Sequence, residues 1–247
     1  MTDLFDHYSY RARLQPALLT LVPVALAALT WAPPGARWLT TLWSLLGVVG
    51  FTVFLANVAR NRGKRLEPEL WKSWGGSPST QLLRHSGPGN SVLRDRWHKQ
   101  LSKLLGKALP TAVQEQANPA DADEVYEAVT RLLIGKTRDT KSYPLVYKEN
   151  VSYGFCRNLF GLRGLGKTVA SMGAIASIGA GAWHMKSGDG DMLPWACAVV
   201  CASLAMWWFF TVTSEWVKVP ATNYAQHLFE CCEKLNRTRK EPEKSDS

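Results

Sequence analysis

The sequence predicts an all-α membrane protein in which two transmembrane helical hairpins (a 2+2 arrangement) flank a basic, mainly helical cytoplasmic domain. Three observations support this fold class. Apolar residues gather in four blocks, each pair of blocks is joined by a short turn, and the net charge of +9 comes entirely from the segment between the pairs. Residues 60–167 hold 19 Lys and Arg against 10 Asp and Glu, whereas the rest of the chain holds 10 of each. Such a concentration of positive charge predicts an anionic partner.

The blocks divide the 247 residues into five predicted parts. In order, these are a cytoplasmic amino-terminal segment, a first hairpin, the basic domain, a second hairpin, and a cytoplasmic helix with a charged tail. Their boundaries are 1–13, 14–58, 59–167, 168–217 and 218–247.

The first hairpin begins with the apolar run Leu14–Ala32, which follows Arg11 and Arg13. A basic start before an apolar core also describes a signal peptide. However, no small-x-small cleavage site follows and a second apolar segment comes at once, which favours an uncleaved span. Pro33-Pro34-Gly35 predicts a tight turn, and Trp38–Val58 is the second predicted span.

The second hairpin pairs a short span with a long one. Thr168–Met185 has 18 residues, and roughly 17–20 are needed to cross a bilayer. Met192–Val217 is longer and aromatic, and Pro220 is expected to end it. Glycine, alanine and serine crowd the short span and favour close helix contact, either within one chain or around the pore of an oligomer. For the pore alternative, the predicted lining residues are Ser171, Gly173, Ser177 and Gly181.

The positions of the cations predict the orientation of the spans. The two hairpin turns hold only Arg37 and Lys186, so nearly all Lys and Arg lie on the other side. By the positive-inside rule, both termini and the basic domain are cytoplasmic in a multi-pass membrane protein. No ionisable residue lies at mid-depth in a span, which argues against a proton-coupled carrier.

The basic domain is expected to contain at least two helices, Arg96–Leu109 ending at Pro110 and Asp121–Ile134 with Asp121 as its cap and Gly135 at its exit. Gly75–Asn90 is expected to be a loop, and Thr137–Tyr153 to form a short β-hairpin. Past Pro220, an apolar pattern predicts a further helix, followed by a charged, disordered tail over residues 237–247.

The first of these helices offers a candidate anion-binding surface. Lysines recur at every fourth position, so they share one helical face, and a tryptophan is available for base stacking. The candidate ligand-binding residues are Arg94, Arg96, Lys99, Lys103, Lys107 and Trp97. The alternative is that this face contacts solvent or lipid headgroups.

Tyr147–Thr168 connects the basic domain to the second hairpin. It contains the phosphate-loop pattern Gly161-x-x-x-x-Gly166-Lys167-Thr168. A true phosphate loop requires a strand before it, and none is evident here. We therefore expect a membrane-entry element in which glycines permit a bend. Its gating or coupling residues are predicted to be Arg157, Arg163 and Lys167, although the same corner could hold a phosphate without hydrolysing it.

No catalytic constellation can be assembled from the sequence. The five cysteines form no Cys-x-x-Cys pair, and no Cys/His set has zinc-ligand spacing. We therefore expect no metal, no cofactor and no enzymatic activity, with ATP hydrolysis at Lys167 as the alternative.

The layout of two spans, basic domain, two spans and tail, with the segment Glu149–Arg163, resembles the bacterial membrane effectors of nucleotide-signalling anti-phage systems, such as four-span pore formers and Hailong-type channels. The resemblance implies a homo-oligomeric channel in the bacterial inner membrane. It also implies gating by a nucleotide or oligonucleotide, a partner nucleotidyltransferase system, and loss of membrane potential as the outcome. A membrane adaptor that binds anionic lipid or a protein is the alternative function.

Overall fold

The computed structural model describes residues 7–32, 35 and 37–240, without the side chains of residues 44, 45 and 237–240. All regular elements in these residues are helices, and no strand occurs among them. The predicted all-α class is therefore confirmed. The predicted turn Pro33-Pro34-Gly35 falls mostly outside the described residues, as does the tail beyond Lys240.

The chain divides into two compact units. Unit 1 comprises Met1–Glu67 and Val151–Val217, and unit 2 comprises Pro68–Asn150 and Lys218–Ser247. Residues 59–67 and 151–167, which the sequence assigns to the basic domain, thus pack with unit 1. The reason is that helices continue past the ends of the apolar blocks, so hydropathy and packing change at different residues.

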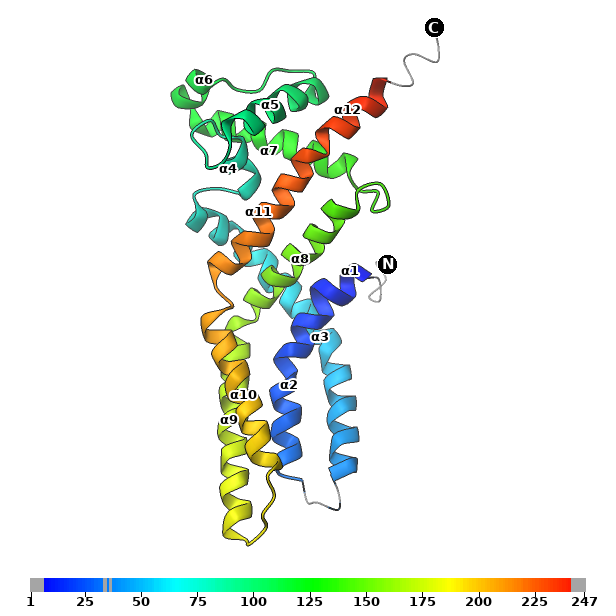
Figure 1. The fold of residues 1–247 in the computed structure, drawn as a ribbon, viewed down its shortest axis with the longest axis vertical. Helices are drawn as coiled ribbons and strands as arrows, with labels where there is room; N and C mark the ends of the chain where they lie inside the picture. The colour runs from blue at the N-terminus through cyan, green and yellow to red at the C-terminus, as the bar shows by residue number, and fades with distance from the viewer. Residues whose placement is uncertain (1–6, 33–34, 36, 241–247) are drawn as a thin grey trace. The chain divides into compact units, whose positions relative to one another are not determined.

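Unit 1 contains the apolar helices. Its elements are α1 (His7–Ser9), the π-helix η1 (Tyr10–Leu14), α2 (Gln15–Thr30), most of α3 (Arg37–Trp74), the second half of α8 (Pro144–Gly161), α9 (Arg163–Lys186) and α10 (Leu193–Phe210). Figure 1 shows α2, α9 and α10 side by side, and these three helices contact one another.

Three helical runs among the described residues are long and apolar enough to cross a membrane: His7–Thr30, Arg37–Leu83 and Leu193–Phe210. The second run begins with the apolar part of α3. These runs support the prediction of a membrane protein. The helix α9 is not among them, because its many small residues lower its hydropathy.

The small residues of α9 pack within the chain. A Cβ added at Gly173 would meet Pro23 at 3.0 Å, one added at Gly181 would meet the indole of Trp195 at 2.7 Å, and Ser177 is fully buried. Three of the four predicted pore-lining residues are therefore covered by α2 and α10, while Ser171 is half-buried. Of the two alternatives for this helix, the structure favours packing within one chain.

The helix α3 extends past the predicted span Trp38–Val58 as far as Trp74. The predicted break at Pro220 is wrong. In the second hairpin, the break falls after Phe210, and α11 (Ser214–Glu230) runs through Pro220. The hydroxyl of Thr213 accepts a hydrogen bond from the Trp216 amide at 3.3 Å, which starts the new helix before the proline.

Unit 2 is a small helical domain with its own core. It contains α4 (Pro78–Leu83), α5 (Ser91–Leu105), α6 (Ala112–Ala117), α7 (Pro119–Lys136), most of α11 and α12 (Cys232–Lys240). The core is formed by fully buried side chains from four of these helices: Leu83, Leu101, Tyr126, Val129, Leu133, Leu228 and Phe229.

Several local predictions in unit 2 need correction. The helix predicted over Arg96–Leu109 is α5, which starts five residues earlier behind the cap Asn90 and ends where Gly106 adopts a left-handed φ of 72°. For α7, Asn118 rather than Asp121 is the cap, and Gly135 lies inside the helix. The side chains of Asn90 and Asn118 fix where the two helices begin, and the positive φ of Gly106 fixes where α5 ends.

Three segments predicted to be irregular or extended are helical. The loop Gly75–Asn90 contains α4, whose cap Ser77 accepts a hydrogen bond from the Thr80 amide. The predicted β-hairpin Thr137–Tyr153 is wrong, because α8 begins at Pro144 and buries its apolar residues at helical spacing. The predicted tail starts within α12.

Candidate functional site

The best-defined polar site in unit 1 lies where α3 crosses α8. Two glycines allow this crossing: a Cβ at Gly161 would lie 2.7 Å from the Gly63 backbone nitrogen, and a Cβ at Gly63 would lie 2.6 Å from Asn158 Oδ1. Backbones can approach this closely only where both helices lack a side chain. The close crossing brings a polar side chain of α3 against several polar side chains of α8.

An ion pair is buried at this crossing. The guanidinium of Arg157 donates from Nη1 to Glu67 Oε1 at 2.8 Å, and the hydroxyl of Tyr153 donates to the same oxygen at 2.7 Å. The Arg157 and Glu67 side chains are only 10% and 14% exposed. We call Glu67, Tyr153, Arg157 and Asn158 the junction cluster.

The junction cluster also ties in the amino-terminal helices. The side-chain amide of Asn158 donates to the backbone oxygen of Ala12 at 2.7 Å, so α8 is fastened to η1 as well as to α3. Burial alone would lower the pKa of Arg157, but the adjacent Glu67 carboxylate outweighs it and raises that pKa. The arginine therefore stays charged inside the junction.

Two buried atoms of the junction cluster, Arg157 Nε and Asn158 Oδ1, have no hydrogen-bond partner among the described residues. Unmet hydrogen-bonding capacity in a buried network lowers its stability and makes a second arrangement easier to reach. The junction cluster therefore combines a buried ion pair with two buried polar atoms that lack hydrogen-bond partners among the described residues.

The phosphate-loop pattern does not form a phosphate loop. Gly161 ends α8, only Leu162 separates it from α9, and the rest of the pattern lies in α9. No strand precedes it in the described chain, and a Cβ at Gly166 would overlap the Trp208 ring. Gly161 and Gly166 allow close packing, and the predicted bend falls where α8 ends and α9 begins.

The three predicted coupling residues have different surroundings. Only Arg157 belongs to the buried junction cluster. Arg163 is exposed and its guanidinium carbon lies 4.1 Å from the centre of the Phe160 ring, while Lys167 Nζ lies 4.6 Å from that of Phe209. Glu67 and Tyr153 were not predicted as site residues. Glu67 is the first acid after the cations of residues 60–65, and this position was the available signal for it.

The candidate anion-binding residues separate into buried and exposed groups. Arg94 is buried and donates to the backbone oxygens of His85 and Gly87, both at 2.8 Å. Trp97 is buried against Phe229, so it has no face free for base stacking. These two residues stabilise unit 2 and do not belong to the exposed basic surface.

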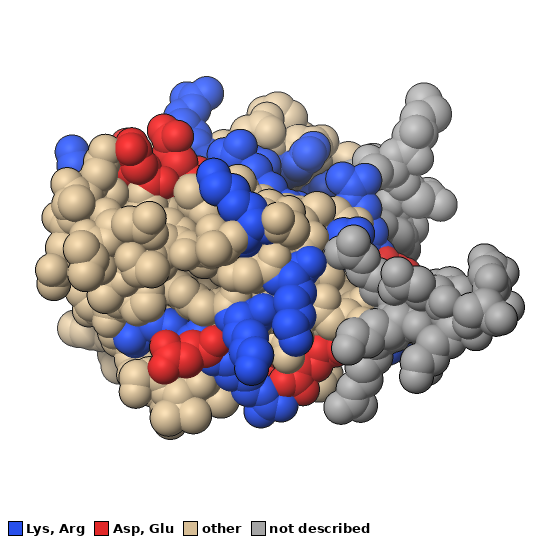
Figure 2. Space-filling view, turned by 90° about the horizontal axis from the view of Figure 1, so that it is seen from above, with Lys and Arg blue, Asp and Glu red and all other residues tan. Residues whose placement is uncertain are grey.

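The exposed group consists of Lys99, Lys103 and Lys107, although Lys107 lies beyond the end of α5. Arg96 is exposed too, but it forms an ion pair with Glu233 of α12. Figure 2 shows Lys and Arg side chains gathered across one face of the molecule, with Asp and Glu at fewer positions. Exposed lysines in this arrangement can bind an anion only as point charges.

A buried carboxylate holds together the part of unit 2 that precedes α5. Glu115 accepts hydrogen bonds from the amides of His85 and Ser86, from the Ser86 hydroxyl, and from the Tyr126 hydroxyl at 2.8 Å. Burial alone would raise the pKa of Glu115, but these hydrogen bonds lower it overall. Next to it, Arg84 forms a two-pronged ion pair with Asp123.

Two histidines lie beside this carboxylate. The rings of His85 and His98 are 4.7 Å apart, and each Nε2 faces a backbone oxygen, that of Pro110 or that of Leu83. Burial lowers the pKa of His98. The surroundings of His98 therefore suit a neutral ring.

Among the described residues, no group of three or more His, Cys, Asp or Glu side chains is placed to hold a metal ion. Comparison of the chain with protein-family models, curated proteins and solved structures finds no match.

Proposed function

We propose that this protein is an oligomeric, ligand-gated membrane pore with both termini and unit 2 on the cytoplasmic side of a bacterial inner membrane. Four spans cross the bilayer in two hairpins. The three long apolar runs provide three of these spans, and α9, which is third along the chain, provides the remaining one. Its 24 residues reach about 36 Å, enough for a hydrocarbon core of about 30 Å. In this proposal, opening collapses the membrane potential as an anti-phage response.

The observation that carries the proposal is the junction cluster. Through Arg157 and Glu67 it ties α8 to α3, through Asn158 it ties α8 to η1, and α8 leads into α9 across the single residue Leu162. A movement of α8 would therefore reach three membrane segments at once. Buried charged contacts with unmet hydrogen bonds are suited to such two-state coupling.

The proposed ligand is an anionic nucleotide or oligonucleotide, made by a partner nucleotidyltransferase. The exposed lysines Lys99 and Lys103 and the charge excess of the middle segment support this choice of ligand. The buried Arg94 and Trp97 are excluded from the binding surface and instead maintain the shape of unit 2.

The pore itself is proposed to form between copies of the chain. The small-residue face of α9 is already covered by α2 and α10, so we do not assign the channel lining to it. The apolar part of α3 is the most exposed span, with Trp38, Trp43 and Val49 all more than 60% exposed. A face of this kind is available to neighbouring protomers.

Conductance of the purified chain in planar bilayers tests the proposal. We expect ion currents that respond to oligonucleotides or cyclic dinucleotides, and we expect Arg157→Met to alter gating while Arg163→Met, an exposed arginine on the same connection, changes it less. Absence of conductance under every ligand, together with unchanged membrane potential in expressing cells, would rule out the pore.

A membrane adaptor is the second candidate function, and the exposed lysines of α5 support it as well. In that case the chain would bind vesicles containing phosphatidylglycerol without releasing a trapped dye. Dye release that depends on Arg157 separates the pore from the adaptor.

A further inference from the structure

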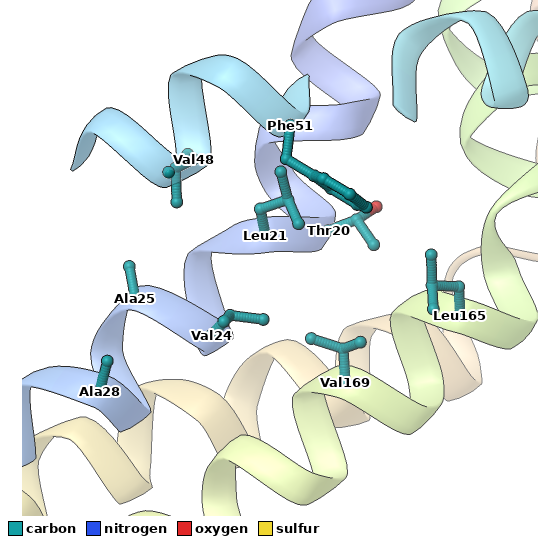
Figure 3. A pocket seen from close by; sticks show the side chains of 10 residues that line it. Thr20, Leu21, Val24, Ala25, Ala28, Val48, Phe51, Leu165 and Val169 are labelled. Carbon is teal, nitrogen blue, oxygen red and sulfur yellow. The ribbon is translucent and has the colours of Figure 1, made fainter. Parts of the chain in front are cut away.

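An apolar cleft of about 450 Å³ opens in unit 1 between α2, α3 and α9. Figure 3 shows Phe51 and Val48 of α3 on one side, a row of α2 side chains on another, and Leu165 and Val169 of α9 on the third. The α2 row extends from Thr20 to Ala28, which is about 12 Å along a helix. The cleft is therefore elongated and runs along helices that are apolar enough to cross a membrane.

The chemistry of the cleft is that of hydrocarbon. Its lining side chains are aliphatic or aromatic except for Thr20, and the Thr20 hydroxyl is already used, since it donates to the backbone oxygen of Pro16 at 2.8 Å. No lining group is free to bind a polar ligand. Water is also a poor occupant, because a buried water needs two or more polar partners.

The length of the cleft and its surroundings indicate which apolar occupant it takes. Each leaflet contributes about 15 Å to a hydrocarbon core of about 30 Å, so one acyl chain is long enough to lie along the row of about 12 Å on α2. Two of the helices that form the cleft, α2 and α3, belong to runs that are apolar enough to cross a membrane, so in a bilayer acyl chains surround the cleft.

We propose that this cleft binds one acyl chain of a bilayer phospholipid as a resident, slowly exchanging ligand. The bound chain fills the space between α3 and the packed helices α2 and α9 and holds α3 apart from them. This inference requires only that unit 1 lies in a bilayer, so it stands whether or not the protein conducts ions.

Photocrosslinking tests the proposal. The full-length protein is reconstituted into vesicles of phosphatidylcholine that carry a small fraction of the same lipid with a diazirine in its acyl chain. After a brief exchange against unlabelled vesicles, the sample is irradiated and the adducts are mapped by mass spectrometry. We expect adducts to persist on Ala25, Ala28 and Val169, while adducts at the exposed position Val199 are lost with the bulk lipid.

Filling the cleft provides the matched comparison. Ala25→Phe and Ala28→Phe each place a ring in the cleft and should abolish the persistent adduct. Ala202→Phe makes the same change at an exposed position on α10 and should leave it unchanged. Because Ala28 is itself exposed at the edge of the cleft, its variant should fold even if Ala25→Phe does not. Equal loss of cleft and Val199 adducts on exchange, or persistence of the cleft adduct in a folded Ala28→Phe variant, would overturn the proposal.

Discussion

Disrupting the junction cluster is the most informative perturbation of unit 1. Arg157→Met leaves the Glu67 carboxylate, 14% exposed, with the Tyr153 hydroxyl as its hydrogen-bond donor at this site. Removing one partner of a buried ion pair costs about 3–5 kcal/mol, because the other charge remains buried. The residual exposure of Glu67 to solvent places the expected loss near the lower end, about 3 kcal/mol.

The reverse change, Glu67→Gln, leaves a guanidinium that is 10% exposed and should be destabilising by a similar amount. The double variant Arg157→Met/Glu67→Gln removes both charges at once, so its loss should be about 1 kcal/mol. The two changes are therefore expected to be strongly non-additive. From these values the coupling energy is about 5 kcal/mol, because most of each single loss is the cost of leaving one charge buried without its partner.

Denaturant titration of the full chain in mixed micelles measures these values, with the 11 tryptophans as the fluorescence signal. Arg163→Met is the control, since that exposed arginine has only a ring contact worth about 0.5–1 kcal/mol. If the two single losses simply add in the double variant, Arg157 and Glu67 do not act as a pair and the reasoning about the junction fails.

Three further predictions concern packing, pH and the buried carboxylate. Gly166→Ala should lower the melting temperature, because its Cβ would overlap the Trp208 ring. Gly164→Ala meets nothing within 4 Å and should raise the melting temperature, because alanine favours a helix over glycine by up to about 1 kcal/mol. Equal effects of the two variants in thermal scans would contradict the packing assigned to α9. For His98, burial lowers the pKa in the folded state below the ordinary 6.5, so the unfolded chain takes up the proton first and unit 2 should lose stability as the pH falls below that value. Comparison of wild type and His98→Gln between pH 7.5 and 5.5 should show a smaller loss in the variant, and identical pH profiles would exclude this histidine. Glu115→Gln should destabilise unit 2 by about 1–3 kcal/mol, because it weakens the hydrogen bonds that the side chain of residue 115 accepts from four donors. The control Gln116→Glu on the same helix should have a smaller effect. Hydrogen exchange of the His85 and Ser86 amides should increase in Glu115→Gln, and unchanged exchange there would refute the role of the carboxylate.

The sequence was a reliable guide where a single physical signal dominated. Long apolar runs identified α2, α3 and α10 as helices that could cross a membrane, and the apolar face of α5 placed Trp97, Leu101 and Leu104 in a core. Local rules were less reliable at helix ends. Pro220 suggested a break that occurs instead after Phe210, and Thr137–Tyr153 looked extended because its aromatic and β-branched residues suit either a strand or a buried helix.

For the candidate site too, the sequence identified charged residues but not their partners. Arg157, Arg163 and Lys167 are equivalent cations when read along the chain, yet only Arg157 is buried against an acid that lies 90 positions away. The partner Glu67 could not be assigned from the sequence, because the pairing depends on where Gly63 and Gly161 let two backbones meet. In the same way, Arg94 looked like part of a basic surface until the folded chain placed two backbone oxygens around its guanidinium.

Hydropathy and charge along the sequence by themselves determined that this is a helical protein with segments long and apolar enough to cross a membrane and with a strongly basic middle region. These quantities are sums over neighbouring residues, so no knowledge of long-range contacts is needed to evaluate them. Only the tertiary structure decided that Gly161, Gly166, Gly173 and Gly181 serve close packing, that Arg157 pairs with Glu67, and that α2, α3 and α9 leave a cleft between them. Each of these features depends on which helix surfaces contact one another in the folded chain, and the same pattern of apolar and charged residues is compatible with many sets of contacts.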